Sequence, residues 1–550
     1  MSQGFLGLNI ALSGLFANQR NLGIISHNVA NAHTEGYSRQ LMNTKAYRPQ
    51  NLVGGKGTIG TGVDITAIKQ VRDSYLDYKT RYETSLKHEW EARAKVLSEI
   101  EGTFNEPSDS SIAKLLDSYY ESINTLAKNP ENQTARTLVR QNIIGLSEGV
   151  RRISTALKAV QKDLNFQFRS AVKEVNGLAE QIRDLNEAIH KAELEGGRAN
   201  DMRDQRNLLV DKLSEYVKVD YYEDEQKRFY VLVGGQQLVA HYRADSFRMI
   251  PREKPINDDD SHGIYDIEWQ NGNPIFLESG KVKGLRDVRD NVSGDFKGIP
   301  YYIDKLNDFV STFTQDFNEI HAGGYGLDKS TDLFMFTTKN RSSAEFRDYL
   351  INSGYNGTKA IEVTEAVQKG LAGVSDKEKA HRIRQNIQDI LAQNPDYAKK
   401  TIFKLDGNYY VVDKIRADEL SMASDLEDLN KLAASNSIDD LVGNGKNMLK
   451  LIETRHQVDM YDWGAPEDYV KSLVSNLGVD AREAYRIAEN QAMLVKDYGR
   501  NRDSIMGVSL DEEMSNMIKY QTAYAANARM VNVFDEMLDL LVNRLGLVGR

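Results

Sequence analysis

Residues 55–60 have the composition of a ligand-binding loop. Their sequence, GKGTIG, matches the pattern G-x-G-x-x-G, and Glu83 follows further along the chain, as an acidic residue does about 20 residues on in a dinucleotide-binding motif. That motif requires a buried strand before the glycines and a helix that begins at them. The preceding segment, YRPQNLVG, lacks the pattern of a buried strand. We therefore interpret residues 55–60 as a glycine-rich turn before the extended segment GVDITAI.

The remaining candidate ligands do not combine into a metal or catalytic site. Residues 257–262, NDDDSH, lack the spaced carboxylates and the distal Glu of an EF-hand loop. The nine histidines, His27 and His33 among them, include no H-E-x-x-H motif and no pair at i, i+4. Cysteine is absent, which excludes disulfides, thiolate metal sites and a cysteine nucleophile. No G-x-S-x-G motif or phosphate-binding Lys-Ser/Thr loop occurs. We predict a protein that is not an enzyme, with no cofactor and no metal.

Composition narrows the classes of partner. A chain of 550 residues predicts several domains. Its net charge of −10 gives no electrostatic case for binding nucleic acid or an anionic membrane. No segment approaches the ~20 apolar residues of a membrane span, and residues 1–20 lack the basic region and cleavage site of a standard signal peptide. We therefore predict no nucleic-acid partner, no membrane insertion and no cleaved signal peptide.

Apolar residues recur with heptad spacing at both ends of the chain. The N-terminal stripe contains Leu8, Leu12, Leu15, Leu22 and Val29. The C-terminal stripe follows a Ser509-x-x-Glu512 capping box and contains Met514, Met517, Tyr524, Val531, Leu538 and Val542. This period is typical of a coiled coil. We predict that Leu8, Leu12, Leu15 and Leu22 pair with Met517, Tyr524, Val531 and Leu538, with the relative register left open.

Large apolar residues also lie outside these two stripes. They are Ile10, Ala11, Phe16 and Ile24 in the first helix and Ile518, Ala523, Ala525, Phe534 and Leu541 in the second. Leaving a large apolar side chain exposed forgoes about 1.5–3 kcal/mol of burial free energy. Pairing the two helices covers one face of each, so the second face favours contact with further copies of the chain. The alternative is that both are core helices of one bundle.

The chain between these ends alternates between helical and strand periodicity. Apolar steps of 3 and 4 predict helices over about 70–104, 132–195 and 299–322, and from about 466 onward. Alternating residues with Gly234-Gly235 and Asn271-Gly272 predict hairpins over 217–280. We predict a mostly α, nested multidomain fold with inserted β and α+β domains. Its parts are a terminal coiled coil (1–38 and 508–550), a helical bundle (39–216, 281–330 and 436–507), a small β domain (217–280) and an inserted mixed domain (331–435).

Residues 24–40, IISHNVANAHTEGYSRQ, resemble the N-terminal signature of bacterial flagellar axial proteins. That signature is an Asn-(Ile/Val)-Ala-Asn core followed by Gly-Tyr, and Ser-Arg-Gln after it looks like the FlgK family of hook-associated proteins. Residues 105–136, 200–217, 280–291 and 507–543 are similar to the same family. Residues 331–435 match no motif of it. The signature residues are Asn28, Ala30, Asn31, Gly36, Tyr37 and Arg39, with Val29 shared between signature and stripe.

The resemblance implies a structural subunit of the bacterial flagellum. FlgK-like proteins form a ring between the hook and the filament, so the implied partners are copies of the same chain, the hook protein and the second hook–filament junction protein. The resemblance also implies export by the flagellar type III apparatus to an extracellular location. A cytoplasmic export chaperone would hold the C-terminal helix. The polar residues of the signature would then form the bend where the chain leaves the first helix, because short amides and Gly satisfy backbone groups locally.

Three alternatives remain open from the sequence. Another flagellar axial protein, such as the second junction protein, a hook subunit or a rod subunit, shares the Asn-Val-Ala-Asn-like signature. A secreted enzyme with flagellar-type termini could carry its chemistry in residues 331–435, although that region has no H-E-x-x-H motif. A coiled-coil scaffold unrelated to flagella would share only the heptads.

Overall fold

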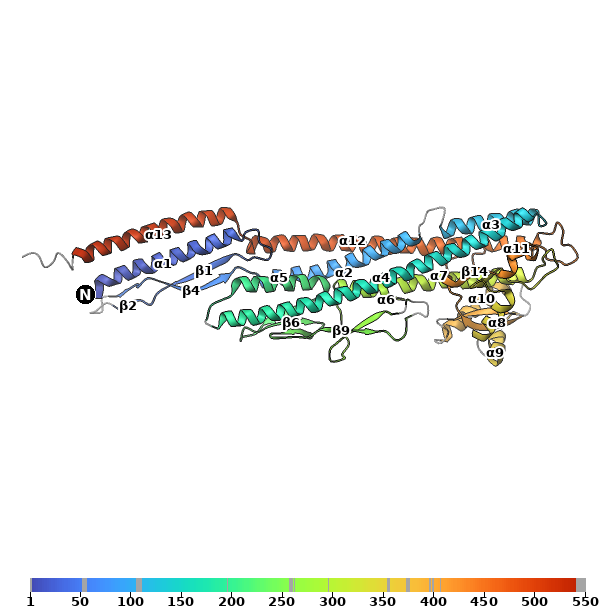
Figure 1. The fold of residues 1–550 in the computed structure, drawn as a ribbon, viewed down its shortest axis with the longest axis horizontal. Coiled ribbons are helices and arrows are strands. Elements are labelled where there is room, and N and C mark those ends of the chain that lie inside the picture. Colours follow the sequence, from blue (N-terminus) through green and yellow to red (C-terminus); the bar gives the residue numbers. More distant parts are fainter. Residues whose placement is uncertain are drawn as a thin grey trace, which may run out of the picture.

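The computed structural model shows an elongated, mostly helical molecule with both termini at the same end (Figure 1). It describes residues 2–51, 57–104, 111–194, 196–256, 261, 263–294, 296–353, 357–371, 376–394, 397, 400–405 and 407–540. The predicted mostly α, nested architecture with paired termini is confirmed. Within the described residues, no helix combines the length and the hydrophobicity needed to span a bilayer.

The first and last helices lie side by side and antiparallel (Figure 1). They are α1 (Ser2–Ala30) and α13 (Leu510–Asp539). The predicted cap is present, because the Ser509 side chain accepts a hydrogen bond from the backbone N–H of Glu512. We call α1 and α13 the terminal pair.

A two-stranded ribbon runs along α1 on the side away from α13 (Figure 1). It consists of β1 (Gln40–Ala46) paired with β4 (Val63–Gln70) and, further out, β2 (Gln50–Asn51) paired with β3 (Thr58–Ile59). We call residues 40–51 and 57–70 the ribbon. We predicted that the helical bundle begins at residue 39, whereas the residues of the ribbon lie against α1. Residues 62–68 were expected to be extended, as β4 is, but β1 was not predicted, because most of its side chains are exposed and no apolar alternation marks it.

A long helical bundle continues from the terminal pair. Its central helix, α4 (Gln133–Glu193), has a stripe of buried apolar residues at steps of 3 and 4, which is why a helix of 61 residues forms. Next to the terminal pair, α2 packs against α12, so the chain leaves and returns along one path. The other bundle helices are α2 (Ser74–Phe104), α3 (Ile112–Lys128), α5 (Asn200–Tyr216), α6 (Lys281–Asp290), α7 (Ile299–Ala322), α11 (Lys446–Glu453), η5 (Thr454–His456) and α12 (Pro466–Met506).

Residues 220–269 form small antiparallel sheets against α4. One sheet has the order β5-β6-β7-β8, and β9 pairs with β10. The predicted turn at Gly234-Gly235 joins β6 to β7 with positive φ at both glycines, as a tight hairpin turn requires. Apolar residues of these strands join the bundle core. The strands are β5 (Asp220–Glu223), β6 (Phe229–Val233), β7 (Gln236–Ala240), β8 (Arg243–Ala244), β9 (Phe247–Pro251) and β10 (Tyr265–Trp269).

The inserted region divides into a base and a small outer unit. At the base, β11 pairs with β14, and their apolar residues belong to the main core. The outer unit has a separate core of Val363, Val367, Ile402, Tyr409 and Val411. The elements are β11 (Phe336–Thr338), α8 (Ser343–Ser353), α9 (Gly357–Val367), α10 (Asp376–Gln393), β12 (Lys400–Leu405), β13 (Asn408–Asp413), η2 (Ala417–Glu419), β14 (Leu420–Met422), η3 (Ser424–Glu427) and η4 (Leu429–Lys431).

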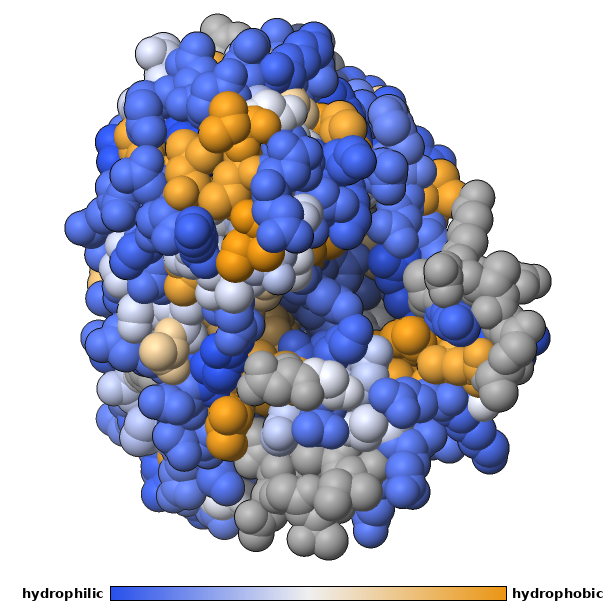
Figure 2. Space-filling model, turned by 90° about the vertical axis from the view of Figure 1, so that its right-hand side faces the viewer, coloured by the Kyte–Doolittle hydropathy of each residue, from blue (hydrophilic) through white to orange (hydrophobic). Residues whose placement is uncertain are grey.

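The domain boundaries of the sequence analysis remain a proposal. The two cores of the inserted region favour a narrower independent unit than 331–435, because residues near both of these limits pack into the bundle. Figure 2 looks onto the end of the molecule remote from the terminal pair, where separate apolar patches interrupt a mostly hydrophilic surface. This end is not a continuous apolar face.

The last turn of α7 anchors the base of the inserted region. His321 is fully buried, its Nδ1 lies 2.6 Å from the Leu333 carbonyl oxygen, and its Nε2 accepts a hydrogen bond from the Ala433 N–H. One imidazole therefore holds the chain where it leaves α7 and where it returns. This pattern requires the neutral ring with its proton on Nδ1. Burial lowers the pKa of His321 to about 4.

We predict that acid weakens this anchor. The unfolded chain binds a proton at the ordinary His pKa of about 6.5, and the folded chain does so only near pH 4. The stabilisation is therefore complete above pH 6.5 and is lost as the pH falls toward 4, by about 1.4 kcal/mol per pH unit. Urea unfolding at pH 7, 6 and 5 measures the change.

The matched control for this prediction is His321→Gln. Glutamine does not titrate, so the variant should be less stable at pH 7 and should lose less stability than the wild type on acidification. Equal pH dependence of the two proteins would contradict the assignment to His321.

Candidate assembly interface

Small residues of α1 form the centre of its contact with α13. A side chain at Gly7 would collide with the ring of Phe534, and a Cβ at Gly14 would lie 3.0 Å from Asn527 Nδ2. Ala11, between these glycines, is buried. The two helices therefore approach closely where α1 has no bulky side chain, and residues of α13 fill the space. We call this contact the seam.

Three contacts give the seam a constant antiparallel register. Gly7 faces Phe534 and Gly14 faces Asn527. At the other end, Asn28 donates a hydrogen bond from Nδ2 to Glu513 Oε2 at 3.3 Å. Each step of seven or fourteen residues forward along α1 matches an equal step back along α13. This settles the register that the sequence left open.

The predicted leucine stripe borders the seam and does not form its centre. The leucines of α1 are half-buried. The centre of the seam is occupied by Gly7, Gly14 and Ala11, and of these Ala11 had been expected to lie outside the contact. The heptad interpretation selected large apolar residues, whereas close approach depends on small ones. Half-buried residues are Leu8, Leu12, Leu15, Leu22, Val29, Met517, Tyr524, Val531, Phe534 and Leu538; Met514 is exposed, and Val542 and Leu541 lie outside the described residues.

The seam ends at a buried asparagine whose amide is fully used. The Asn28 Oδ1 atom accepts hydrogen bonds from the Tyr37 hydroxyl at 2.7 Å and from the Gln40 N–H at 3.0 Å. Its Nδ2 donates to the Gln40 carbonyl and to Glu513. Asn28 is completely buried. It therefore joins α1, the following bend, the start of the ribbon and the first turn of α13.

The residues after the bend bind the bundle. Ser38 donates from its backbone N–H and its hydroxyl to the Asp204 carboxylate at 3.1 and 2.7 Å. Arg72 donates to the same carboxylate and to Asp77. Arg39 donates from its backbone to the Met506 carbonyl and from its guanidinium to Glu512 at 2.6 Å. Residues 27–40 thus contact α5, the end of α12 and α13, and Arg72 links Asp204 to Asp77 of α2.

The other signature residues shape the bend. Asn31 donates to the His27 carbonyl and accepts from the Thr34 hydroxyl. Gly36 has φ +77°, and its Cβ position lies 3.1 Å from the Leu208 side chain, so a residue with a side chain would be strained there. Ala30 is exposed at the last position of α1. The signature thus forms the bend. We expected short amides and Gly in this bend because they satisfy backbone groups locally.

We call residues 27–40 with Arg72, Asp201, Asp204, Glu512 and Glu513 the polar cluster. Sequence reasoning identified the signature but named no partner for Tyr37 or Arg39. The Tyr37 hydroxyl donates to Asn28 Oδ1, and the Arg39 guanidinium binds Glu512 on the first turn of α13. Asp204 and Asp201, on the first turns of α5, bind Ser38 and Gln40, and Glu513 binds Asn28. One hint of the partners on α5 was available in the sequence, because residues 200–217 also resemble the family. That resemblance alone does not predict a contact between α5 and the signature.

Burial and neighbouring charges shift the pKa values of several side chains of the cluster. Burial, with the carboxylates of Asp201, Asp204 and Glu513, raises the pKa of Tyr37, so its hydroxyl keeps the proton that it donates to Asn28. Burial also raises the pKa of Glu513, against the lowering effects of Asn28 and Arg39. Burial likewise raises the pKa of Asp204, although Ser38 and Arg72 favour its ionised form. Most donors and acceptors of the cluster bind each other, although Arg39 Nε and Glu513 Oε1 are buried without a hydrogen-bond partner among the described residues.

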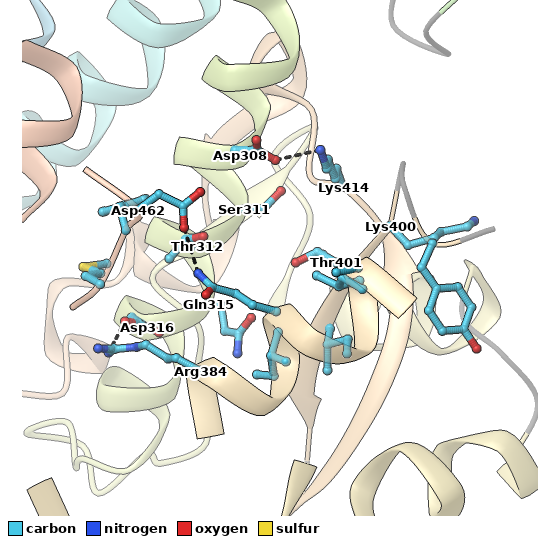
Figure 3. A pocket seen from close by; sticks show the side chains of 18 of the residues that line it. Asp308, Ser311, Thr312, Gln315, Asp316, Arg384, Lys400, Thr401, Lys414 and Asp462 are labelled. Atoms are coloured by element: carbon cyan, nitrogen blue, oxygen red, sulfur yellow. Dashed lines mark hydrogen bonds and ion pairs between the residues drawn. The ribbon is translucent and has the colours of Figure 1, made fainter. Parts of the chain in front are cut away.

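A cavity lies elsewhere, between the inserted unit and α7 (Figure 3). It has a volume of about 680 Å³. Its polar side chains pair across the two units: Arg384 forms an ion pair with Asp316 at 3.0 Å, and the Gln388 amide donates to Asp462 at 2.8 Å. Lys414 binds Asp308 at 2.7 Å. The cavity therefore lies at the contact between two folded units. The polar side chains named here, which line it, already bind each other.

The other segments considered in the sequence analysis contribute nothing further to a site. Residues 58–59 of the GKGTIG segment form β3, an exposed strand, while Gly55 and Lys56 lie outside the described residues. In the NDDDSH segment, only Ser261 is described. His33 is exposed, and His27 lies 3.2 Å from Asp201 in the polar cluster. Among the described residues, no group of three or more His, Cys, Asp or Glu side chains is arranged to hold a metal ion.

Family models match the regions that carry this geometry. The model described as the flagellar hook-associated protein FlgK helical domain matches residues 97–336. Flagella basal body rod protein matches residues 8–37, and flagellar basal body rod FlgEFG protein C-terminal matches residues 503–545. The two rod-protein models thus cover the helices of the terminal pair, and the hook-associated model covers most of the bundle.

Whole-length relatives agree with these matches. The chain is 29% identical to flagellar hook-associated protein 1 of Bacillus subtilis over the full length of both chains. It is 25% identical to that of Salmonella typhimurium, covering 98% of this chain and 99% of the relative. The solved structure of the flagellar hook junction protein FlgK from Burkholderia pseudomallei is similar in fold, with a TM-score of 0.56 and 13% identity. That comparison covers 78% of this chain and all of the other.

These observations define a structural protein of the bacterial flagellum, with paired terminal helices of the axial type. The chain is similar over almost its whole length to members of the flagellar hook-associated protein 1 family, also called FlgK.

We predict that Asn28→Ala loosens the end of the terminal pair. The substitution removes the partner of a buried tyrosine hydroxyl, a backbone N–H and carbonyl, and a carboxylate. Buried polar groups left without a partner cost about 1–3 kcal/mol each. Amide hydrogen exchange should therefore be at least about tenfold faster, equivalent to about 1.4 kcal/mol, in segments 28–40 and 510–516.

Asn31→Ala is the matched control, because the hydrogen bonds described for Asn31 stay within residues 27–34. Its effect should be confined to those residues. If Asn28→Ala left exchange near Glu513 unchanged, the amide would not hold the two helices together.

Proposed function

We propose that this chain is a structural subunit of the hook–filament junction that assembles into a ring through its terminal pair. The similarity to this family supports the location, since its relatives are hook-associated proteins. The observation that carries the assembly role is the exposed apolar face of the terminal pair. The domain division and the individual interface residues belong to this proposal.

The exposed face is large for an isolated chain. Phe16 of α1 is 59% exposed, and Ile518 of α13 is 63% exposed. Several large exposed apolar side chains on one pair of helices indicate contacts with other proteins. The seam covers only one side of each helix, so neighbouring copies supply the remaining burial. The exposed apolar residues of the pair are Ile10, Phe16, Leu510, Met514, Ile518, Met530, Val533, Met537 and Leu540.

The finer partners follow from the family. We propose that the assembled ring contacts the hook protein on one side and the second hook–filament junction protein on the other. Export would use the flagellar type III apparatus, and a cytoplasmic chaperone would cover the exposed face of α13 before export. The polar residues that line the cavity at Asp316 and Arg384 bind each other, which supports a structural role over an enzymatic one.

Deletion of the gene and complementation test the proposal. Cells without the protein should have hooks but no filaments and should shed flagellin into the medium, and the wild-type gene should restore filaments. A filament subunit, a rod subunit or a scaffold unrelated to flagella would give a different phenotype. Normal filaments in the deletion strain would overturn the proposal.

We predict that Ile518→Asp blocks assembly without unfolding the subunit. Because Ile518 is exposed in the single chain, the free energy of unfolding should change by less than about 0.5 kcal/mol. A charge buried between subunits without a partner is costly, so the variant should fail to enter flagella. Immunoblots of purified flagella and of the culture medium measure incorporation.

The matched control is Ile351→Asp. Ile351 is also exposed, but it lies on α8 in the inserted unit, far from the terminal pair. This variant should incorporate normally. Equal incorporation of Ile518→Asp and the wild type would show that this face of α13 is not an assembly surface.

A further inference from the structure

The ribbon, residues 40–51 and 57–70, is covered on one side only. It is held to α1 where the Val63 N–H donates to Ser13 Oγ at 3.1 Å and where Gly62 approaches the Ser13 side chain. Away from α1, nearly all of residues 41–51 are exposed. Tyr47 is 54% exposed, and Leu41, Ile59 and Val63 are also exposed.

The ribbon has open strand edges and an uncovered face, so it could pack against a further element. Both of its strand pairs are two-stranded, so each has an open edge on either side. A two-stranded ribbon is marginally stable alone in water and gains stability from further packing. Open edges and exposed apolar side chains also promote contact with another chain. The contact with α1 leaves one face of the ribbon uncovered.

The outer face of α13 is complementary to the ribbon in charge. The described ribbon contains three cations, Lys45, Arg48 and Lys69, and one carboxylate, Asp64. In contrast, α13 contains six carboxylates and two cations. Near the C-terminus of α13, exposed Glu536 lies on the outward side of the helix, where Val533 and Met537 are also exposed. Each surface thus combines apolar side chains with charges of opposite sign.

The two surfaces lie on different sides of the same subunit. Helix α1 packs against α13 on one side and against β1 and β4 on the other (Figure 1). A contact between one copy's ribbon and the next copy's α13 is therefore heterologous, and such contacts repeat from copy to copy into rings or helices. A self-complementary contact would stop at a dimer. The arrangement therefore suits a circular or helical assembly.

We propose that the ribbon of each subunit docks on the outer face of α13 of the neighbouring copy. The proposal rests on the proposed assembly through the terminal pair and names the surface that covers α13. Arg48 approaches the carboxylate of Glu536 of the neighbour, and Tyr47 packs among its exposed methionines.

Cysteine cross-linking in assembled flagella tests this contact, because the chain contains no native cysteine. The double variant Tyr47→Cys with Met537→Cys is expressed in the deletion strain, and purified flagella are treated with a short bismaleimide. Dimers and a ladder of higher oligomers should form, because each copy contributes one cysteine to each of two neighbours. Either single variant should give no ladder.

Two controls separate this contact from assembly itself. Tyr47→Cys with Phe276→Cys, which pairs the ribbon with an exposed residue of the β region, should assemble but give no oligomers. The purified monomer of the test variant should also give none. If flagella incorporate the test variant and no oligomers form, the docking proposal fails while the junction role stands. If the wild-type chain itself is absent from flagella, the proposed function fails.

Discussion

The constant antiparallel register between α1 and α13 is the constraint on which the architecture depends. Gly7 and Gly14 admit Phe534 and Asn527 because they have no side chain, and Asn28 binds Glu513 at the same register. The first and last helices therefore begin and end at matching levels. Everything between them must leave the pair and return to it at one end, which is why α2 and α12 lie together and why the inserted regions project from the middle of the chain.

Apolar stripes alone would not fix this register. Two heptad surfaces can slide by seven residues and still bury similar area, whereas a buried polar residue with one set of partners is satisfied in a single alignment. Asn28 has this role here, since each of its amide atoms is hydrogen-bonded. The same side chain binds the bend and the ribbon. The alignment of the helices and the direction in which the chain leaves them are thus determined together.

Sequence reasoning found the parts whose signal is local. The 3- and 4-residue steps of α4, the cap at Ser509 and the turn at Gly234-Gly235 each depend on neighbouring residues. It missed features that depend on distant ones. Ser38 and Asp204 are 166 residues apart, and no pattern in either segment names the other. The seam was misplaced for another reason: close helix contact depends on small residues, whereas the heptad pattern draws attention to leucines. The segment GVDITAI was correctly expected to be extended, but its partner strand β1 was missed because the side chains of β1 alternate little in burial.

The narrow base of the inserted region has a consequence of its own. The chain leaves the bundle and returns to it at the short β11–β14 pair. His321 binds the chain near both points, through the Leu333 carbonyl and the Ala433 N–H. Beyond that base, the outer unit has its own hydrophobic centre. A change confined to this outer centre should therefore disturb the bundle helices less than a change at the base, where the apolar residues belong to the main core. The outer centre is thus the part of the inserted region in which a foreign segment would be grafted with least effect on the bundle.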